Sequence, residues 1–160
     1  MMARATAVAV YALLKVGVDI MPRKAKGRML WGQISVSPRV NKLSLKACLL
    51  YTWLIAHADD QGRMLADTNS IKGTVCPLRQ DISEDDIATL LGEIEEQGLI
   101  IRYNTQVRMG DKHKSAMVLQ LVDWWEYQWL TKPRPSEFPP ADEWTDRLPR
   151  TFNRFKEVGG

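Results

Sequence analysis

The stretch from Ser83 to Gly98 constrains the fold most, because it carries local signals for both ends of one helix. Ser83 can cap the helix start, and Asp86 three residues later completes a shortened capping box. Gly98 can adopt the left-handed conformation that ends a helix. Apolar residues recur between these ends at helical spacing. They are Ile87, Leu90, Leu91 and Ile94. The sequence therefore predicts an amphipathic helix that buries one face.

The same region is strongly acidic, with seven acids and no Lys or Arg from position 81 to position 97. The acids are Asp81, Glu84, Asp85, Asp86, Glu93, Glu95 and Glu96. Acids at the start suit the positive end of the helix dipole, whereas acids at the end do not. Glu93, Glu95 and Glu96 are therefore the candidate protein-interaction residues, as a surface for a basic partner.

Two further helices and two strands are predicted around this helix. Ser44 can cap a helix that runs through Ala58, and Asp67 or Thr68 can cap another over residues 69–75. Residues 99–103 and 116–122 are expected to be strands, with a polar loop at 104–115 between them. Residues 63–66 are expected to be a short extended piece, and residues 29–40 to be extended because Pro38 disfavours helix before it.

Three helices followed by a β-hairpin are the element order of a winged helix-turn-helix domain. The predicted fold class is therefore mainly α (α+β), with the polar loop as the wing. The predicted domain covers residues 28–130. Four aromatic residues near its end are expected to pin a closing segment across the core rather than to stack on bases. They are Trp124, Trp125, Tyr127 and Trp129.

The flanking regions have different compositions. Residues 1–27 combine an apolar leader with a basic arm, and Lys15 interrupts the leader in a way that argues against a signal peptide or a membrane span. Two interpretations stay open: an over-called start, with Met21 as the natural one, which we favour, or an appended amphipathic helix. Residues 131–160 are expected to be an extended Pro-rich strap followed by a charged tail that is either frayed or a partial helix.

Basic residues are concentrated in two places, although the net charge of the chain is only +3. Seven bases and no acid lie between Met21 and Lys46, and the predicted wing carries three more. Clustered bases favour contact with phosphates. Lys72 and Arg79 flank the turn before the acidic helix. The predicted DNA-binding residues are Arg23, Lys24, Lys26, Arg28, Arg39, Lys42, Lys46, Lys72, Arg79, Arg108, Lys112 and Lys114.

The sequence contains no catalytic or cofactor signature. It has two histidines, no glycine-rich phosphate loop and no nucleophile elbow. Cys48 and Cys76 lack metal-binding spacing, and reduced buried thiols in a cytoplasmic protein are expected. Turn and helix-start chemistry explains the paired acids Asp59–Asp60 and Asp85–Asp86. We therefore predict a protein that is not an enzyme and that binds no cofactor or metal.

An ordered set of short segments resembles a family of phage and prophage proteins of the replisome-organiser type. The N-terminal winged-helix domain of that family is similar to that of primosomal DnaD-like proteins. The matching residues are Arg23 to Arg28, Leu43-Ser44, Ala58-Asp59-Asp60-Gln61-Gly62-Arg63, Asp67 to Lys72, Val75-Cys76-Pro77, Gly98-Leu99-Ile100, Tyr103, Trp125, Gln128, Lys132-Pro133, Pro135-Ser136 and Pro139-Pro140. The resemblance implies DNA binding during phage replication initiation and recruitment of a replicative helicase or its loader.

Two functions from different classes follow. The first is non-catalytic DNA binding, in which the basic arm and the wing straddle the DNA backbone through contacts that do not specify sequence. The alternative is a protein–protein adaptor that uses the acidic third helix and binds little or no DNA. No membrane partner is expected, and the oligomeric state stays open.

Overall fold

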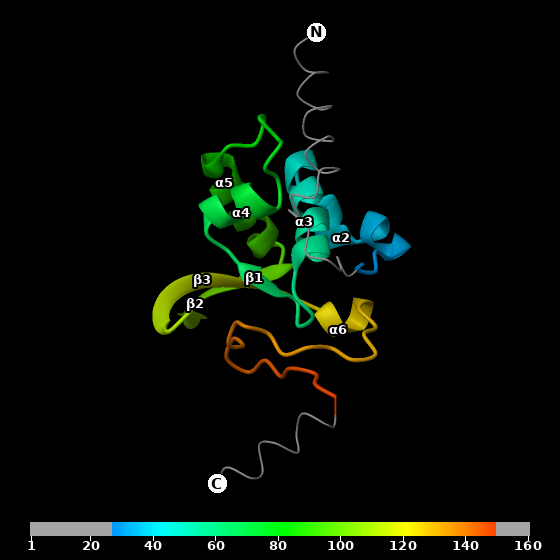
Figure 1. Cartoon of the computed structure of the whole chain (residues 1–160). Coiled ribbons are helices and arrows are strands. Elements are labelled where there is room, and N and C mark those ends of the chain that lie inside the picture. The colour runs from blue at the N-terminus through cyan, green and yellow to red at the C-terminus, as the bar shows by residue number, and fades with distance from the viewer. Residues whose placement is uncertain (1–26, 150–160) are drawn as a thin grey trace, which may run out of the picture.

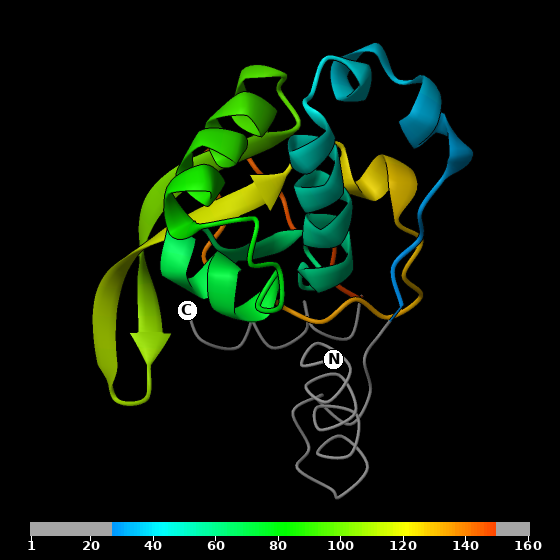
Figure 2. The same cartoon turned by 90° about the horizontal axis from the view of Figure 1, so that it is seen from above.

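The computed structural model describes residues 27–149, which form a mixed helix-and-strand fold. Within this range three helices lie on one face of a three-stranded antiparallel sheet (Figures 1 and 2). The helices are α3 (Leu45–His57), α4 (Thr68–Thr74) and α5 (Glu84–Glu96). The strands are β1 (Arg63–Leu65), β2 (Ile100–Met109) and β3 (Lys112–Leu121), in the order β1-β3-β2. The α+β class is confirmed. The apolar leader, Arg23, Lys24, Lys26 and the last eleven residues lie outside the described range.

The predicted helix boundaries are confirmed, because side chains close in sequence set them. Ser44, Asp67 and Ser83 each accept a hydrogen bond from a backbone N–H in the first turn of α3, α4 and α5. Asp86 accepts from the backbone of Ser83, so the predicted capping box is formed. Gly98 ends α5 with a φ of +68°, a conformation that costs glycine little.

The core lies between the three helices and the sheet. The apolar stripe of α5 is buried, and α5 packs against α3, α4 and β2. Burial of each large apolar side chain contributes roughly 1.5–3 kcal/mol to folding. The largest buried apolar side chains are Leu50, Leu54, Ile71, Ile82, Ile87, Leu91, Ile94, Ile100, Leu119 and Leu121.

Two predictions of local structure are wrong. Residues 29–40, expected to be extended, contain the 3-10 helix η1 (Gly32–Val36) and the start of helix α2 (Pro38–Asn41). Ser37 is extended, as expected before proline, but its side chain caps α2 and Pro38 occupies the first turn, where its fixed φ suits a helix. The predicted loop at 104–115 is mostly strand, because β2 and β3 pair without a break up to Met109 and Lys112.

The C-terminal segment packs on the opposite face of the sheet from the helices (Figure 1). After β3 the chain forms the short helix α6 (Trp124–Tyr127) and then returns as the strap, which we define as residues 131–149. Residues 141–149 were expected to belong to a frayed tail. They are instead held by hydrogen bonds of Asp146 and Arg147 to the turn before β1.

Candidate functional site

The tip of the β2–β3 hairpin is the first candidate site. The hairpin extends past the helices in both views (Figures 1 and 2). Residues 108 to 115 are all exposed, and they include Arg108, Lys112, His113 and Lys114 against the single acid Asp111. Among residues 27–149 none of these charged side chains forms an ion pair. The tip therefore presents its positive charge to solvent.

Strand register places these bases on both faces of the tip. Directly paired residues share a face and successive residues alternate. Arg108 pairs with His113, while Lys112 pairs with Met109 and Lys114 with Val107. Arg108 and His113 therefore point to one side of the ribbon, and the two lysines point to the other. The Nε of Arg108 donates to the carbonyl of Gly110 at 3.0 Å, which holds the guanidinium beside the turn.

Two of the predicted DNA-binding bases have structural partners instead. Arg28 donates to the carbonyl of Ala58 and forms an ion pair with Asp60 at 2.9 Å, and both side chains are 7% exposed. The Nζ of Lys72 donates to the carbonyls of residues 76, 79 and 82 and thereby closes the loop between α4 and α5. Neither group is presented to an outside partner.

Three more bases of the set are engaged at the surface. Arg39 pairs with Asp123 at 2.6 Å, and this carboxylate raises the pKa of the guanidinium. Arg79 pairs with Asp81 and lowers the pKa of that exposed carboxyl through a hydrogen bond. Lys46 donates to the carbonyl of Asp81 at 2.7 Å. The remaining member, Lys42, is exposed, and no contact brings it near the hairpin tip.

The acids at the end of α5 also have internal partners, which explains their unfavourable position on the helix dipole. Glu93 accepts from the backbone and hydroxyl groups of Ser44 at the start of α3. Glu95 accepts from the backbone of Arg102 at 2.9 Å and from its guanidinium at 2.6 Å. Glu96 is exposed. Two of the three residues of the predicted acidic docking surface, Glu93 and Glu95, therefore have partners within the fold.

The turn that leads into β1, residues 59–63 with Arg63 as the first residue of the strand, binds the strap, a role that no pattern in the sequence indicates. Arg63 has no exposed side-chain surface and donates to Gln120, to the carbonyl of Phe138 and to the carboxylate of Asp146. Gln61 bonds to the backbone of Arg134 and Arg147. This turn therefore holds the strap in place through hydrogen bonds.

Burial raises the pKa of Asp59 in this turn, against hydrogen bonds from Ser136 and two backbone N–H groups. Gly62 occupies the turn with a φ of +82°. A Cβ at this position would lie 2.7 Å from the ring of Trp124. Both the backbone conformation and the close approach therefore require glycine.

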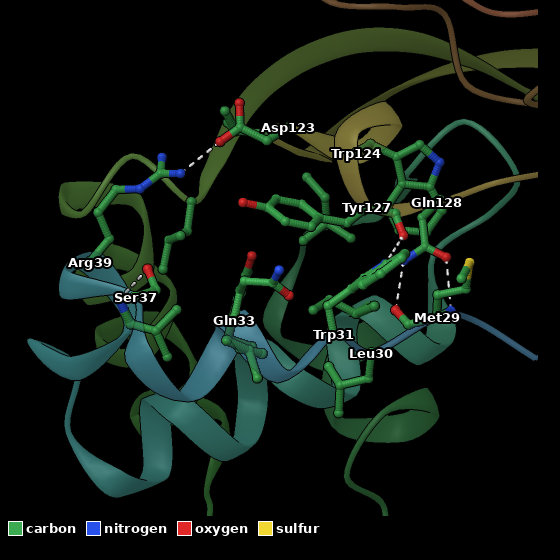
Figure 3. A pocket seen from close by; sticks show the side chains of 17 residues that line it. Met29, Leu30, Trp31, Gln33, Ser37, Arg39, Asp123, Trp124, Tyr127 and Gln128 are labelled. Carbon is green, nitrogen blue, oxygen red and sulfur yellow. Dashed lines mark hydrogen bonds and ion pairs between the residues drawn. The ribbon is translucent and has the colours of Figure 1, made fainter.

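A second candidate site is an apolar cleft between η1, α3 and α6 (Figure 3). Trp31 donates to the carbonyl of Tyr127 at 2.7 Å, and the Gln128 side chain makes two hydrogen bonds to the backbone of Met29. The pair Arg39–Asp123 closes one end. Burial in the wall of the cleft raises the pKa of Tyr51 to about 12.

The rim of this cleft carries exposed apolar side chains. Leu30 is 55% exposed and Trp129 is 70% exposed, and Trp129 contacts Trp31 edge to face at 5.3 Å between ring centroids. Exposed contiguous apolar surface of this type is common at protein-binding sites. The cleft can accept an apolar side chain from outside.

Across residues 27–149, no group of three or more His, Cys, Asp or Glu side chains is placed to hold a metal ion. No helix in that range combines the length and the apolar character needed to span a bilayer. Comparison of the chain with protein-family models, with curated proteins and with solved structures finds no match.

Proposed function

We propose that this chain is a cytoplasmic winged-helix protein that binds duplex DNA without catalysis, through phosphate contacts made by the hairpin tip. The observation that carries the proposal is the unpaired positive charge on both faces of that exposed tip. The order α3, β1, α4, α5, β2, β3 supports it, because a winged helix-turn-helix domain has this order. The β2–β3 hairpin is then the wing.

The charge of α5 determines how DNA would be approached. In a helix-turn-helix domain the start of the recognition helix contacts base edges in the major groove. Here that position holds the exposed acids Glu84 and Asp85, which the phosphate backbone repels. Docking led by the wing avoids this repulsion. Contacts of the wing bases with phosphates position the protein without reading sequence.

The set of residues that we propose as the interface is smaller than the set predicted from the sequence. It consists of Arg108, Lys112 and Lys114, with His113 beside them on the tip. Arg28 and Lys72 are left out because their cationic groups are occupied by partners within the fold. The resemblance to replisome organisers supports a role in phage replication initiation beside a helicase or its loader, and this role is part of the proposal.

A salt titration with a random duplex tests the DNA proposal. Each phosphate contact contributes about 0.9 to the slope of log affinity against log salt, so replacing Arg108, Lys112 and Lys114 by Ala should lower the slope by about 2.7. A matched control replaces three exposed bases elsewhere and makes the same change in net charge. They are Lys42, Lys132 and Arg134. Equal effects of the two triple variants, or no binding of the parent at low salt, would refute the proposal.

Self-association is a second candidate function, favoured by the cleft and its rim. An apolar cleft beside the projecting side chains Leu30 and Trp129 allows a twofold arrangement in which each copy inserts a rim residue into the other. Sedimentation of the full chain over a range of concentrations tests this. The dimer should form in the parent and weaken in Trp129→Ala, while Leu78→Ala, an exposed apolar control, should behave as the parent does. A parent that stays monomeric at every concentration would exclude it.

An adaptor that docks a basic protein on α5 is the weaker alternative. Glu93 and Glu95 are bound within the fold, so Glu96 and the acids at the start of the helix would have to form the surface. These two groups lie at opposite ends of α5. A basic partner would therefore meet a divided charge rather than one patch.

A further inference from the structure

The hairpin tip carries a large apolar side chain among its charges. Met109 is 53% exposed, and it is the last residue of β2 before the turn at Gly110 and Asp111. It does not belong to the hydrophobic core of the described residues. This apolar side chain is therefore available to an outside partner.

The surroundings of Met109 are open. A Cβ placed at Gly110 would meet no atom of the described residues within 4 Å, and Gly110 has a φ of +62°, which the tight turn requires. Met109 shares its face with Lys112 and Lys114, and Arg108 lies on the opposite face. The apolar side chain is therefore flanked by cations on both sides of a narrow projecting turn.

This combination matches the requirements of a DNA wedge. Proteins that deform DNA from the minor groove insert an apolar side chain, methionine included, between two base pairs, while nearby bases of the protein bind the phosphates. The flexible, unbranched chain of methionine adapts to an irregular gap of this kind. Cations on both faces of the tip can reach phosphates on both strands along one groove.

We propose that Met109 inserts between base pairs on the minor-groove side, so that the preferred ligand of this protein is duplex DNA that kinks easily. This inference rests on the proposed DNA binding by the wing and deepens it. The unstacking energy depends on the step, and it is smallest at flexible pyrimidine–purine steps and at mismatches. The tip would thus select DNA by deformability, without a hydrogen bond to any base edge.

The test compares the binding of two duplexes, equal in length and charge, to the full chain. One carries a central mismatch and the other is fully paired and G·C-rich. The parent should bind the mismatched duplex about tenfold more tightly than the paired one, equivalent to about 1.4 kcal/mol. Fluorescence energy transfer between the two ends of the mismatched duplex should show that they come closer together when the protein binds. Met109→Gln, a polar side chain of similar length, should lose both the preference and the bending. Met109→Leu should keep them.

Two further measurements, on one more variant and on the salt slope, distinguish insertion of Met109 from DNA binding by the hairpin tip. Leu78→Ala removes an apolar side chain that is more exposed than Met109 and lies away from the wing, and it should leave the preference intact. Met109→Gln should also keep the salt slope of the parent, because it removes no cation. If Met109→Gln binds and bends both duplexes as the parent does, the wedge is refuted while wing binding stands. If the parent binds neither duplex, both proposals fall.

Discussion

Two charged regions of this molecule have opposite environments. The turn at residues 59–63 holds two acids and a base, and two of these groups, Asp60 and Arg63, are buried and paired with Arg28 and Asp146. The hairpin tip at residues 108–114 holds four basic side chains and one acid, all exposed and without ion pairs among the described residues. Charge holds the fold together in the first region and is available to a ligand in the second.

The difference shows that the number of charges in a segment does not identify its role. What separates the two regions is the distance along the chain to a partner. The partner of Asp60 is Arg28, which lies 32 positions away in the sequence. The partner of Arg63 is Asp146, which lies 83 positions away. The tip residues meet across the two-residue turn Gly110–Asp111, and Asp111 forms no ion pair with them among the described residues.

The largest expected effect is at Arg63. Arg63→Met should lower the free energy of unfolding by about 3–5 kcal/mol, because it leaves the Asp146 carboxylate without its cation in a mostly buried site. Urea unfolding of the full chain measures this. The double variant of Arg63→Met and Asp146→Leu should lower the free energy of unfolding by less than the sum of the losses in the two single variants. A loss below about 1 kcal/mol for Arg63→Met would mean that the turn and the strap do not depend on this pair.

A smaller loss is expected at Lys72, which contacts three carbonyls between α4 and α5. Lys72→Met should cost about 2–3 kcal/mol, since charged hydrogen bonds contribute more than neutral ones. Lys42→Met removes an exposed lysine and should stay within about 0.5 kcal/mol of the parent. Equal unfolding midpoints for the two variants would show that Lys72 is free for an outside partner.

The third effect depends on pH. The folded pKa of Asp59 is raised by burial, so the folded state binds a proton more tightly than the unfolded state does. Its contribution to stability is therefore greatest below the unfolded pKa and is lost as pH rises through the raised folded pKa. Asp59→Asn keeps the acceptor oxygen for Gln61 and Arg63 and removes the titration. The stability of the parent relative to this variant should fall as pH rises from 4 to neutrality; a constant difference would contradict the account.

The smallest effect on stability is expected at the hairpin tip. Arg108→Ala, Lys112→Ala and Lys114→Ala should each change the free energy of unfolding by no more than about 0.5 kcal/mol. Thermal melts of the three variants and of the parent should coincide within the error of the method. A loss of unfolding free energy as large as that of Arg63→Met would mean that the tip contributes to the stability of the fold. The two regions would then not differ in the way described above.

The features that could be predicted from the sequence are those whose cause is local. Ser44, Asp67 and Ser83 cap helices through backbone groups within three residues of them, so short patterns were sufficient. The central part of the β2–β3 hairpin was predicted as a loop, because most of its residues are polar and Val107 is the one buried side chain among residues 104–115. Its bases were nevertheless identified, since exposure was the correct assumption there.

Most of the features that could not be predicted depend on residues far apart in sequence. Arg28 was included in the predicted interface because nothing near it in the sequence marks its acceptors, 30 and 32 positions away. Lys72 was included although its acceptors lie only 4, 7 and 10 positions away, because they are backbone carbonyls of a loop and leave no residue pattern. The strap was expected to be a linker followed by a frayed tail, and the contacts of Arg147 with Gln61 span 86 positions. Charged residues in the Pro-rich segment therefore reflect packing on the turn, which pattern analysis does not detect.

The partner of Arg63 is synthesised long after Arg63 itself, and this order affects how the chain folds. On the ribosome, α3, α4, α5 and the three strands have been made by Leu121, while α6 and Asp146 are still to come. A native-like intermediate at that stage would have to bury a guanidinium without its counter-charge, which is costly. We expect the domain to complete its folding only when the last part of the strap has emerged, with a slow rate typical of contacts between distant residues.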